Sequence, residues 1–410
     1  MLQTGKEQER KFLGFGGCFN ELGWNALSVL SEADLNIVFA ELFSPGKALS
    51  FELCRIPIGA SDFARDWYSC NETASDFAME NFTVDRDKEA LIPFIREAQK
   101  RQPTLKFFAS PWSPPIWLKT PPIYNGGSLK QEPEVLKAYA LYFLKFVRAY
   151  KNEGIPIDQV HVQNEPVSAQ LFPSCLMSGE EMKRFVRDYL GPLFKKEGVD
   201  TEIWLGTLNG PETDKRFIST SFNHYLNHIL EDKKVREYVT GASYQWAGKY
   251  AVQRTRLAYP ELPIMQTENE CGDGLNSWEY ASYVFDLFYH YLTNDVCAYI
   301  YWNMILAEDG KSTWGWKQNS LYTVNLATGQ LTRTHEFYLM RHFSDFIHAG
   351  ARRVELSGPF SGNSIAYRCN GKLVLVIRNP FNREKCISVR DSSVAYSAIL
   401  PADSFNTLVI

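Results

Sequence analysis

The segment Gln159-Val-His-Val-Gln-Asn-Glu-Pro166 decides how the rest of the chain is interpreted. Its first half alternates β-branched and polar residues, as a strand does, and its second half is a polar cluster closed by a proline. Strands that run into polar side chains are typical of parallel α/β proteins, which form their ligand sites at the carboxyl ends of the strands. Further segments of this kind, separated by helices, would place it in a parallel sheet.

Seven other segments share this pattern, and amphipathic stretches lie between them. One such stretch is Pro133–Asn152, and another opens with a capping box of Ser178 and Glu181. Eight strand–helix units over about 290 residues predict an α/β fold, a (β/α)8 TIM barrel, with an open doubly wound sheet as the alternative. The predicted strands are 14–19, 50–59, 105–112, 159–165, 202–208, 240–246, 263–270 and 297–304.

The chain changes character after a predicted helix at 333–349. Short alternating segments follow, which predict a small antiparallel β-sandwich side domain at the C-terminus. About sixty residues are marginal for an independent core, so we expect this domain to pack on the barrel. The predicted domains are a catalytic barrel at 14–349 and a side domain at 350–410, to which part of 1–13 is expected to add an edge strand. The predicted side-domain strands are 353–356, 364–368, 372–378, 394–400 and 407–410.

Composition excludes several classes of protein. The 43 basic and 47 acidic side chains give a net charge of −4, and this balance predicts no nucleic-acid binding. With 45% hydrophobic residues and no apolar run of membrane-spanning length, we expect a globular protein without a membrane span. The first residues lack the apolar core of a signal peptide, and the eight cysteines are scattered. The sequence therefore predicts a cytoplasmic protein with reduced thiols and neither metal nor cofactor, or a secreted one if a signal segment has been removed. It does not set the oligomeric state.

Two carboxylates lie at the predicted strand ends, where a barrel builds its active site. Glu165 ends the fourth strand and Glu268 the seventh, so the barrel would bring them face to face across its mouth. Glycosidic bond cleavage needs such a pair, one to protonate the leaving oxygen and one to attack or to activate water. Gln266, Glu268 and Glu270 share one face of an ideal strand, so either of these two glutamates could be the second carboxylate.

Five motifs, in one order, resemble glycoside hydrolase family 30, which includes the glucosylceramidases and related β-glycosidases. The similarity extends through nearly the whole chain and implies a (β/α)8 barrel with a side β-structure. The motifs are RIPIGASDF at 55–63, SPWSPPIWLKT at 110–120, QNEP at 163–166, QTENECG at 266–272, and YWNM at 301–304 followed by TWGWKQNS at 313–320.

The resemblance implies a role for each matching position. Glu165 corresponds to the acid/base and Glu268 to the nucleophile of a retaining double displacement. Asn164 is expected to bind the sugar hydroxyl next to the anomeric carbon, and Arg55 to lie against the nucleophile and keep it ionised. Asp62, Trp112, Trp302 and Asn319 correspond to residues around the non-reducing sugar. The remaining expected substrate contacts, at strand ends and in the loop after strand eight, are Tyr244, Gln245, Trp246, Glu270 and Trp314.

The expected substrate is a neutral β-linked glycoside, cleaved by β-glucosidase or glucosylceramidase-like chemistry. Where the glucosylceramidases have a His and a Tyr after strand six, this chain has Tyr244-Gln245-Trp246, which weakens the expectation of ceramide as the aglycone. The alternatives within the family are an endo-β-1,6-glucanase, a β-fucosidase and a β-xylosidase. A catalytically silent carbohydrate-binding protein on the same barrel is the remote alternative.

Overall fold

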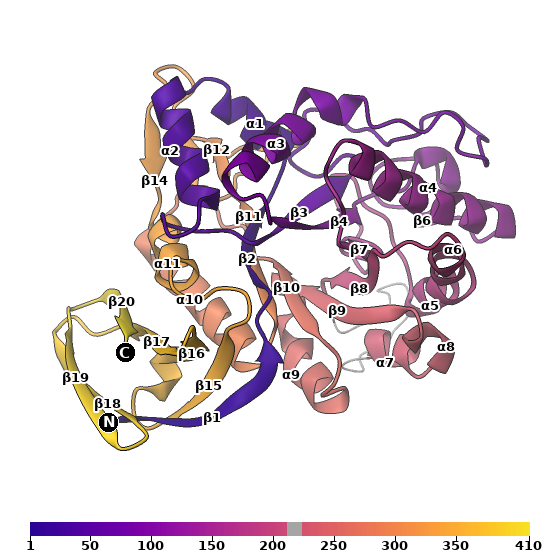
Figure 1. Cartoon of the computed structure of the whole chain (residues 1–410). Helices are drawn as coiled ribbons and strands as arrows, with labels where there is room; N and C mark the ends of the chain where they lie inside the picture. The colour runs from indigo at the N-terminus through magenta and orange to yellow at the C-terminus, as the bar shows by residue number, and fades with distance from the viewer. Residues whose placement is uncertain (211–223) are drawn as a thin grey trace.

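Eight parallel strands form a closed barrel, and helices surround it (Figure 1). The computed structural model describes residues 1–210 and 224–410. The strand order around the barrel is β10-β11-β2-β3-β4-β7-β8-β9, which confirms the predicted barrel and rules out the open sheet. The barrel strands are β2 (Gly14–Cys18), β3 (Leu53–Ile58), β4 (Lys106–Pro111), β7 (Gln159–His161), β8 (Glu202–Leu208), β9 (Val239–Gln245), β10 (Ile264–Glu268) and β11 (Ala298–Asn303).

Packed side chains fill the barrel interior below the carboxyl ends of its strands. Leu53, Phe108 and Met265 belong to one buried cluster there. His161 stacks on Trp204 in the same region, and burial lowers its pKa well below the ordinary value. This filling leaves the carboxyl ends of the strands as the place for polar groups that meet a ligand.

The helices form where the sequence is amphipathic and capped. At α5, the Ser178 hydroxyl accepts from the Glu181 amide while the Glu181 carboxylate accepts from the Ser178 amide, so the predicted capping box is present. No described helix has the length and apolar character needed to cross a membrane. The α-helices are α1 (Glu21–Leu27), α2 (Glu32–Phe43), α3 (Leu91–Arg101), α4 (Pro133–Asn152), α5 (Gly179–Phe185), α6 (Gly191–Lys196), α7 (His224–Leu230), α8 (Lys233–Arg236), α9 (Lys249–Ala258), α10 (Trp278–Thr293) and α11 (His335–Ser344).

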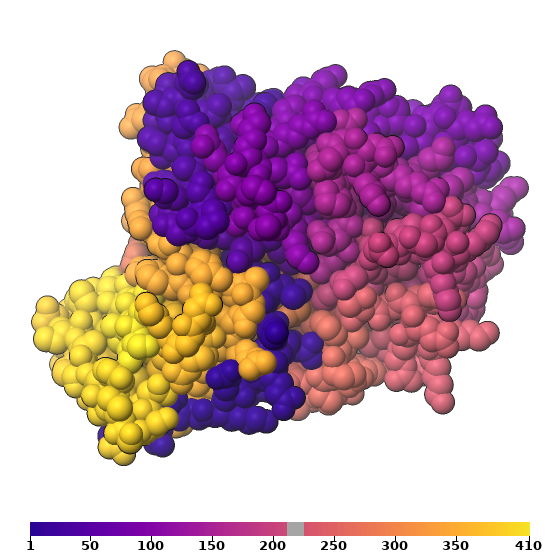
Figure 2. Space-filling view, viewed as in Figure 1, coloured from indigo at the N-terminus to yellow at the C-terminus, as the bar shows by residue number. Residues whose placement is uncertain are grey.

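The side domain is a mostly antiparallel sheet with its own apolar core, and it forms a lobe beside the barrel (Figure 2). It contacts the barrel helices through Phe405, which stacks on Phe285 of α10 at 5.7 Å between ring centroids. The seven strands, in spatial order, are β19 (Val394–Leu400), β18 (Lys385–Asp391), β1 (Leu2–Lys11), β15 (Arg352–Ser357), β16 (Ser364–Cys369), β17 (Lys372–Asn379) and β20 (Ser404–Val409).

Two details of this sheet differ from the prediction. The N-terminal strand β1 is not an edge strand, because β15 pairs with one side of it and β18 with the other. Strand β18 was not predicted at all. Only Ile387 and Val389 of this strand are buried, so its apolar alternation is too short to stand out in the sequence.

Candidate active site

Glu165 lies beyond the last regular residue of β7, in a strained backbone conformation. Its φ of 47° falls in the left-handed region, which residues other than glycine rarely adopt. The Glu165 amide donates to the Thr207 carbonyl at 3.1 Å, which ties this turn to the neighbouring strand β8. The side chain is 7% exposed, so the turn holds a carboxyl group at the barrel mouth with little access to water.

Glu268 reaches the barrel mouth through a break in the strand alternation. Met265 packs inside the barrel, so regular alternation would turn Glu268 outward, toward the helices. The register between β9 and β10 shifts between Gln266 and Glu268, and this irregularity turns Glu268 inward instead. The assumption that Gln266, Glu268 and Glu270 share a face was therefore wrong, although Glu268 is at the mouth.

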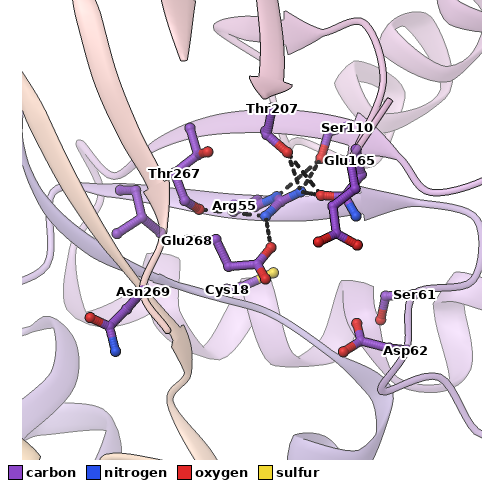
Figure 3. Close-up of polar contacts among 12 residues, drawn as sticks. Cys18, Arg55, Ser61, Asp62, Ser110, Glu165, Thr207, Thr267, Glu268 and Asn269 are labelled. Atoms are coloured by element: carbon purple, nitrogen blue, oxygen red, sulfur yellow. Dashed lines mark hydrogen bonds and ion pairs between the residues drawn. The ribbon is translucent and has the colours of Figure 1, made fainter. Parts of the chain in front are cut away.

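Arg55 of β3 joins the carboxylate of Glu268 to the strands around it (Figure 3). Its Nη1 donates to Glu268 Oε2 at 2.6 Å, and its Nη2 donates to Asn164 Oδ1 at 2.7 Å. Ser110 Oγ accepts from both Nε and Nη2, at 3.0 and 2.8 Å. The Trp112 ring covers the guanidinium, with 4.3 Å between Cζ and the ring centroid. These contacts on several N–H donors fix the buried, planar guanidinium in one orientation.

The two glutamates have different electrostatic surroundings. Burial raises the pKa of Glu268, and the ion pair with Arg55 opposes that rise. Burial and the nearby Glu268 charge raise the pKa of Glu165 to about 8. No described ion pair involves Glu165, whose carboxylate accepts instead from the neutral Gln170 amide at 2.9 Å. A carboxyl pair arranged in this way favours a charged Glu268 and a protonated Glu165 near neutral pH.

Asp62 supplies a third buried carboxyl group, which Figure 3 shows directed toward those of Glu165 and Glu268. Burial and the Glu268 charge raise its pKa to about 8. Gln318 Nε2 lies 3.4 Å from Asp62 Oδ2. Among the described residues, Oδ1 of Asp62 has no hydrogen-bond partner. A buried oxygen without a partner is costly, which suggests that a ligand hydroxyl completes it.

Aromatic side chains line the same region. Trp112 and Trp302 lie 5.3 Å apart between ring centroids, and Phe172 and Trp314 belong with them to one apolar cluster at the mouth. The indole N–H groups of Trp302 and Trp314 find no acceptor within the described part of the chain. Apolar rings with free N–H donors suit a sugar, which has apolar C–H faces and a rim of hydroxyls.

The three residues expected to contact substrate at the end of β9 lie in different surroundings. Gln245 points inward and is fully buried, and in the described structure neither end of its amide has a partner. Trp246 is half-buried after the strand, with Lys249 Nζ 5.3 Å from its ring centroid. Tyr244 contradicts the expectation, because strand alternation turns it outward, where its hydroxyl meets Thr255 of α9 at 2.7 Å.

Asn319 has a structural role that was not expected, and Glu270 differs from the expectation. Both ends of the Asn319 amide are occupied, with Nδ2 donating to Glu336 at 2.6 Å and Oδ1 accepting from the Gly274 amide at 2.8 Å. Asn319 thus holds the loop after β10, while the second N–H of its Nδ2 group makes no described hydrogen bond. The Glu270 carboxylate accepts from the Tyr283 hydroxyl of α10, so it faces the helix layer.

Sequence reasoning missed five residues of the site. Ser110 was within reach, because it shares a strand face with the inward Phe108. Thr207, Gln318 and Glu336 act through bonds between segments far apart in the sequence, which carries no local signal for them. Gln170 lies only five residues after Glu165, but in an irregular loop that strand or helix periodicity does not describe. The five missed residues are Ser110, Thr207, Gln170, Gln318 and Glu336.

A barrel whose mouth holds two buried carboxyl groups, only one of them paired with an arginine, between aromatic walls has the construction of a glycoside hydrolase. The chain belongs to glycoside hydrolase family 30: the family's TIM-barrel domain model matches residues 12–347.

Known proteins similar over nearly the whole chain agree with this assignment. The chain is 27% identical to the lysosomal acid glucosylceramidase of Mus musculus, over 98% of this chain and 82% of that protein. It is 26% identical to an endo-1,6-β-D-glucanase of Aspergillus fumigatus, over 99% and 86%. Among solved structures, an endo-β1,6-glucanase superposes with a TM-score of 0.87 at 26% identity, over 99% of this chain and 93% of the other.

Proposed function

We propose that this glycoside hydrolase cleaves β-glucosides with retention of configuration, using Glu268 as the nucleophile and Glu165 as the acid/base. The observation that carries the proposal is the unequal treatment of the two carboxyl groups. Glu268 has a buried arginine at 2.6 Å, while Glu165 has only a neutral amide donor. Double displacement requires this inequality, because one group must start charged and the other protonated.

In the first step, Glu268 attacks the anomeric carbon while Glu165 gives its proton to the departing oxygen. Arg55 keeps Glu268 oriented through contacts that also fix Asn164. The Oδ1 of Asn164 is occupied by Arg55 and Thr207, so Nδ2 is the end that can donate to the sugar hydroxyl beside the anomeric carbon.

In the second step, Glu165 is ionised and acts as the base. Formation of the glycosyl–enzyme ester removes the negative charge of Glu268, and with it a cause of the high pKa of Glu165. Glu165 then takes a proton from the water that attacks the anomeric carbon and releases the sugar.

Glucose is the proposed sugar in the first subsite. The names of the similar glucosylceramidase and endo-1,6-β-D-glucanase both specify a glucosyl group. Asp62 would accept hydrogen bonds from hydroxyls through its unpaired oxygen, and Trp112 and Trp302 would line the sugar.

Endo-β-1,6-glucanase activity is the second candidate. It is favoured by the similarity to enzymes of that name in both sequence and structure. It is also favoured by the end of β9, where Trp246 offers a partly exposed ring to a further sugar.

The proposal is tested with p-nitrophenyl β-glucoside, a glucosylceramide and a β-1,6-glucan, each given to the wild type, Glu268→Ala and Glu165→Ala. We expect release of glucose or glucan oligosaccharides by the wild type and loss of turnover in Glu268→Ala. Azide should restore turnover of the aryl glucoside in Glu165→Ala and yield a β-glucosyl azide. An α-configured first product, observed by NMR, would contradict retention.

A further inference from the structure

Four buried polar side chains form one hydrogen-bonded chain that ends on Asp62. The Gly23 amide at the start of α1 donates to Asn20 Oδ1 at 2.7 Å, and Asn20 Nδ2 donates to Asn303 Oδ1 at 3.1 Å. Asn303 Nδ2 donates to Gln318 Oε1 at 2.8 Å, and Gln318 Nε2 lies 3.4 Å from Asp62 Oδ2. All four side chains are at most 4% exposed.

Backbone groups at the start of this series of hydrogen bonds fix which end of each amide donates and which accepts. A backbone N–H can only donate, so Gly23 requires the oxygen of Asn20 and turns the Asn20 N–H2 group toward Asn303. Each following amide is oriented in the same way, with its oxygen accepting from the amide before it and its N–H2 group directed toward Asp62. The Asn319 carbonyl can only accept, and it lies 3.5 Å from Asn303 Nδ2, which supports the same orientation.

We propose that Gln318 is a positioning residue for sugar recognition: the amide relay from α1 through Asn303 keeps its N–H2 end on one oxygen of Asp62 and leaves the other for a sugar hydroxyl. The inference rests on the proposed function, because it takes Asp62 as a sugar-binding carboxylate. It assigns a role to three amides, Asn20, Asn303 and Gln318, which lie outside the carboxyl pair.

A donor at this position matters because burial and the negative Glu268 both act against an ionised Asp62. Burial and the Glu268 charge raise the pKa of Asp62, whereas the Gln318 donor and Arg55 lower it. A reversed Gln318 amide would set an oxygen against Asp62 Oδ2 and would raise the pKa of that carboxyl group further. The titratable groups around Asp62 are Glu268 of β10, Glu165 after β7, Arg55 of β3, Cys18 of β2 and Cys271 after β10.

Three variants test the relay without removing Asp62. Gln318→Met keeps the length of the side chain but cannot donate. Gln318→Glu accepts from Asn303 and donates to Asp62 only when the introduced carboxyl is protonated. Asn303→Asp changes a residue that does not contact Asp62. The second oxygen of the introduced carboxylate can only accept, so it should bind the N–H2 group of Gln318 and reverse that amide.

The measurements are KM and kcat for p-nitrophenyl β-glucoside, and the Kd of the neutral, uncleaved p-nitrophenyl β-thioglucoside, across pH. We expect Gln318→Met and Asn303→Asp to raise KM and Kd about tenfold, with a smaller change in kcat. In Gln318→Glu both constants should be raised at high pH and should return toward the wild-type values as the pH falls. A merely structural role would not give that recovery.

Asn379→Asp is the matched control, because it places a carboxyl group at a buried amide of the side sheet, far from Asp62 in the fold. It should lower the free energy of unfolding and leave KM and Kd unchanged. Wild-type KM and Kd in all three relay variants would overturn the relay while leaving the proposed function intact. If the wild type acts only on a β-1,6-glucan, the comparison uses its oligosaccharides. A wild type that neither cleaves nor binds any of these sugars overturns both.

Discussion

At the scale of single residues, the site depends on Arg55, which supplies both charge and geometry. Its charge favours the ionised form of Glu268, and its other donors orient Ser110 and Asn164. Charge and geometry can be separated by substitution, because lysine keeps the cation but loses the planar fork.

Arg55→Lys should therefore lower kcat/KM about 100-fold while the acid limb of its pH profile stays near that of the wild type. Arg55→Met should also move the acid limb by about 1–3 pH units to higher pH. The sign follows from the proposed role of Glu268: a nucleophile must be ionised to attack, so a higher pKa removes activity at a higher pH. An unmoved acid limb in Arg55→Met would show that Arg55 does not control this carboxyl group.

The alkaline limb of the pH profile should depend on Glu165, the proposed acid/base. It must be protonated to act as the acid, so kcat/KM for an alkyl glucoside should fall above about pH 8, where its pKa lies. In Glu165→Gln the limb should disappear for a dinitrophenyl β-glucoside, whose leaving group needs no proton. A limb that persists in this variant would belong to Asp62, whose pKa is also raised to about 8.

At the scale of elements, the loops after the barrel strands are fixed by hydrogen bonds from other loops. The loop after β10 follows Glu268 directly, and Asn319 holds it through the backbone amides of Gly274 and Asn276, at 2.8 and 3.3 Å. Asn319 is itself held by the buried Glu336 of α11. This loop is therefore tied to α11 through Asn319, and we expect it to open less readily than a free surface segment.

Asn319→Ala should lower the free energy of unfolding by about 2–4 kcal/mol, because it leaves two backbone amides and one oxygen of the buried Glu336 carboxyl group without a partner. Asn25→Ala, on the exposed face of α1, is the control and should change it by less than about 0.5 kcal/mol. Urea denaturation measures both. Equal stability of the two variants would mean that the loop is held by other contacts.

The elements also show what the sequence could predict. Strands and helices followed from periodicity, and the strand ends pointed to Glu165 and to either Glu268 or Glu270, between which the family resemblance selected Glu268. The manner in which Glu268 turns inward was not predictable, because a local register shift replaces the alternation on which the prediction relied. The Asn319 contacts were equally out of reach, since they join residues 17 to 45 positions apart through side chains.

At the scale of the whole molecule, barrel and side sheet are joined at both ends of the chain. Strand β1 precedes the barrel in sequence but lies inside the side sheet, between β15 and β18. Leu2 belongs to the apolar core of that sheet, together with Val389 and Leu400. The side domain is thus completed by residues that a division at position 350 would assign elsewhere.

Leu2→Ala should lower the stability of the side sheet by about 2–4 kcal/mol and make β18 and β19 more sensitive to proteolysis. Gln3→Ala, at the exposed neighbouring position, should have little effect. Digestion patterns of the two variants give the comparison. Identical patterns would show that β1 is dispensable, as the predicted edge strand would have been.

The position of β1 has a consequence for synthesis on the ribosome. Gln3 pairs with Ser357, so β1 waits for about 350 further residues before β15 can join it. At about 5–20 residues per second, that is a wait of roughly 20–70 s. An unpaired strand is prone to aggregation, yet β1 carries Lys6, Glu7, Glu9, Arg10 and Lys11. We expect these charges to oppose aggregation of the nascent strand until its neighbours emerge.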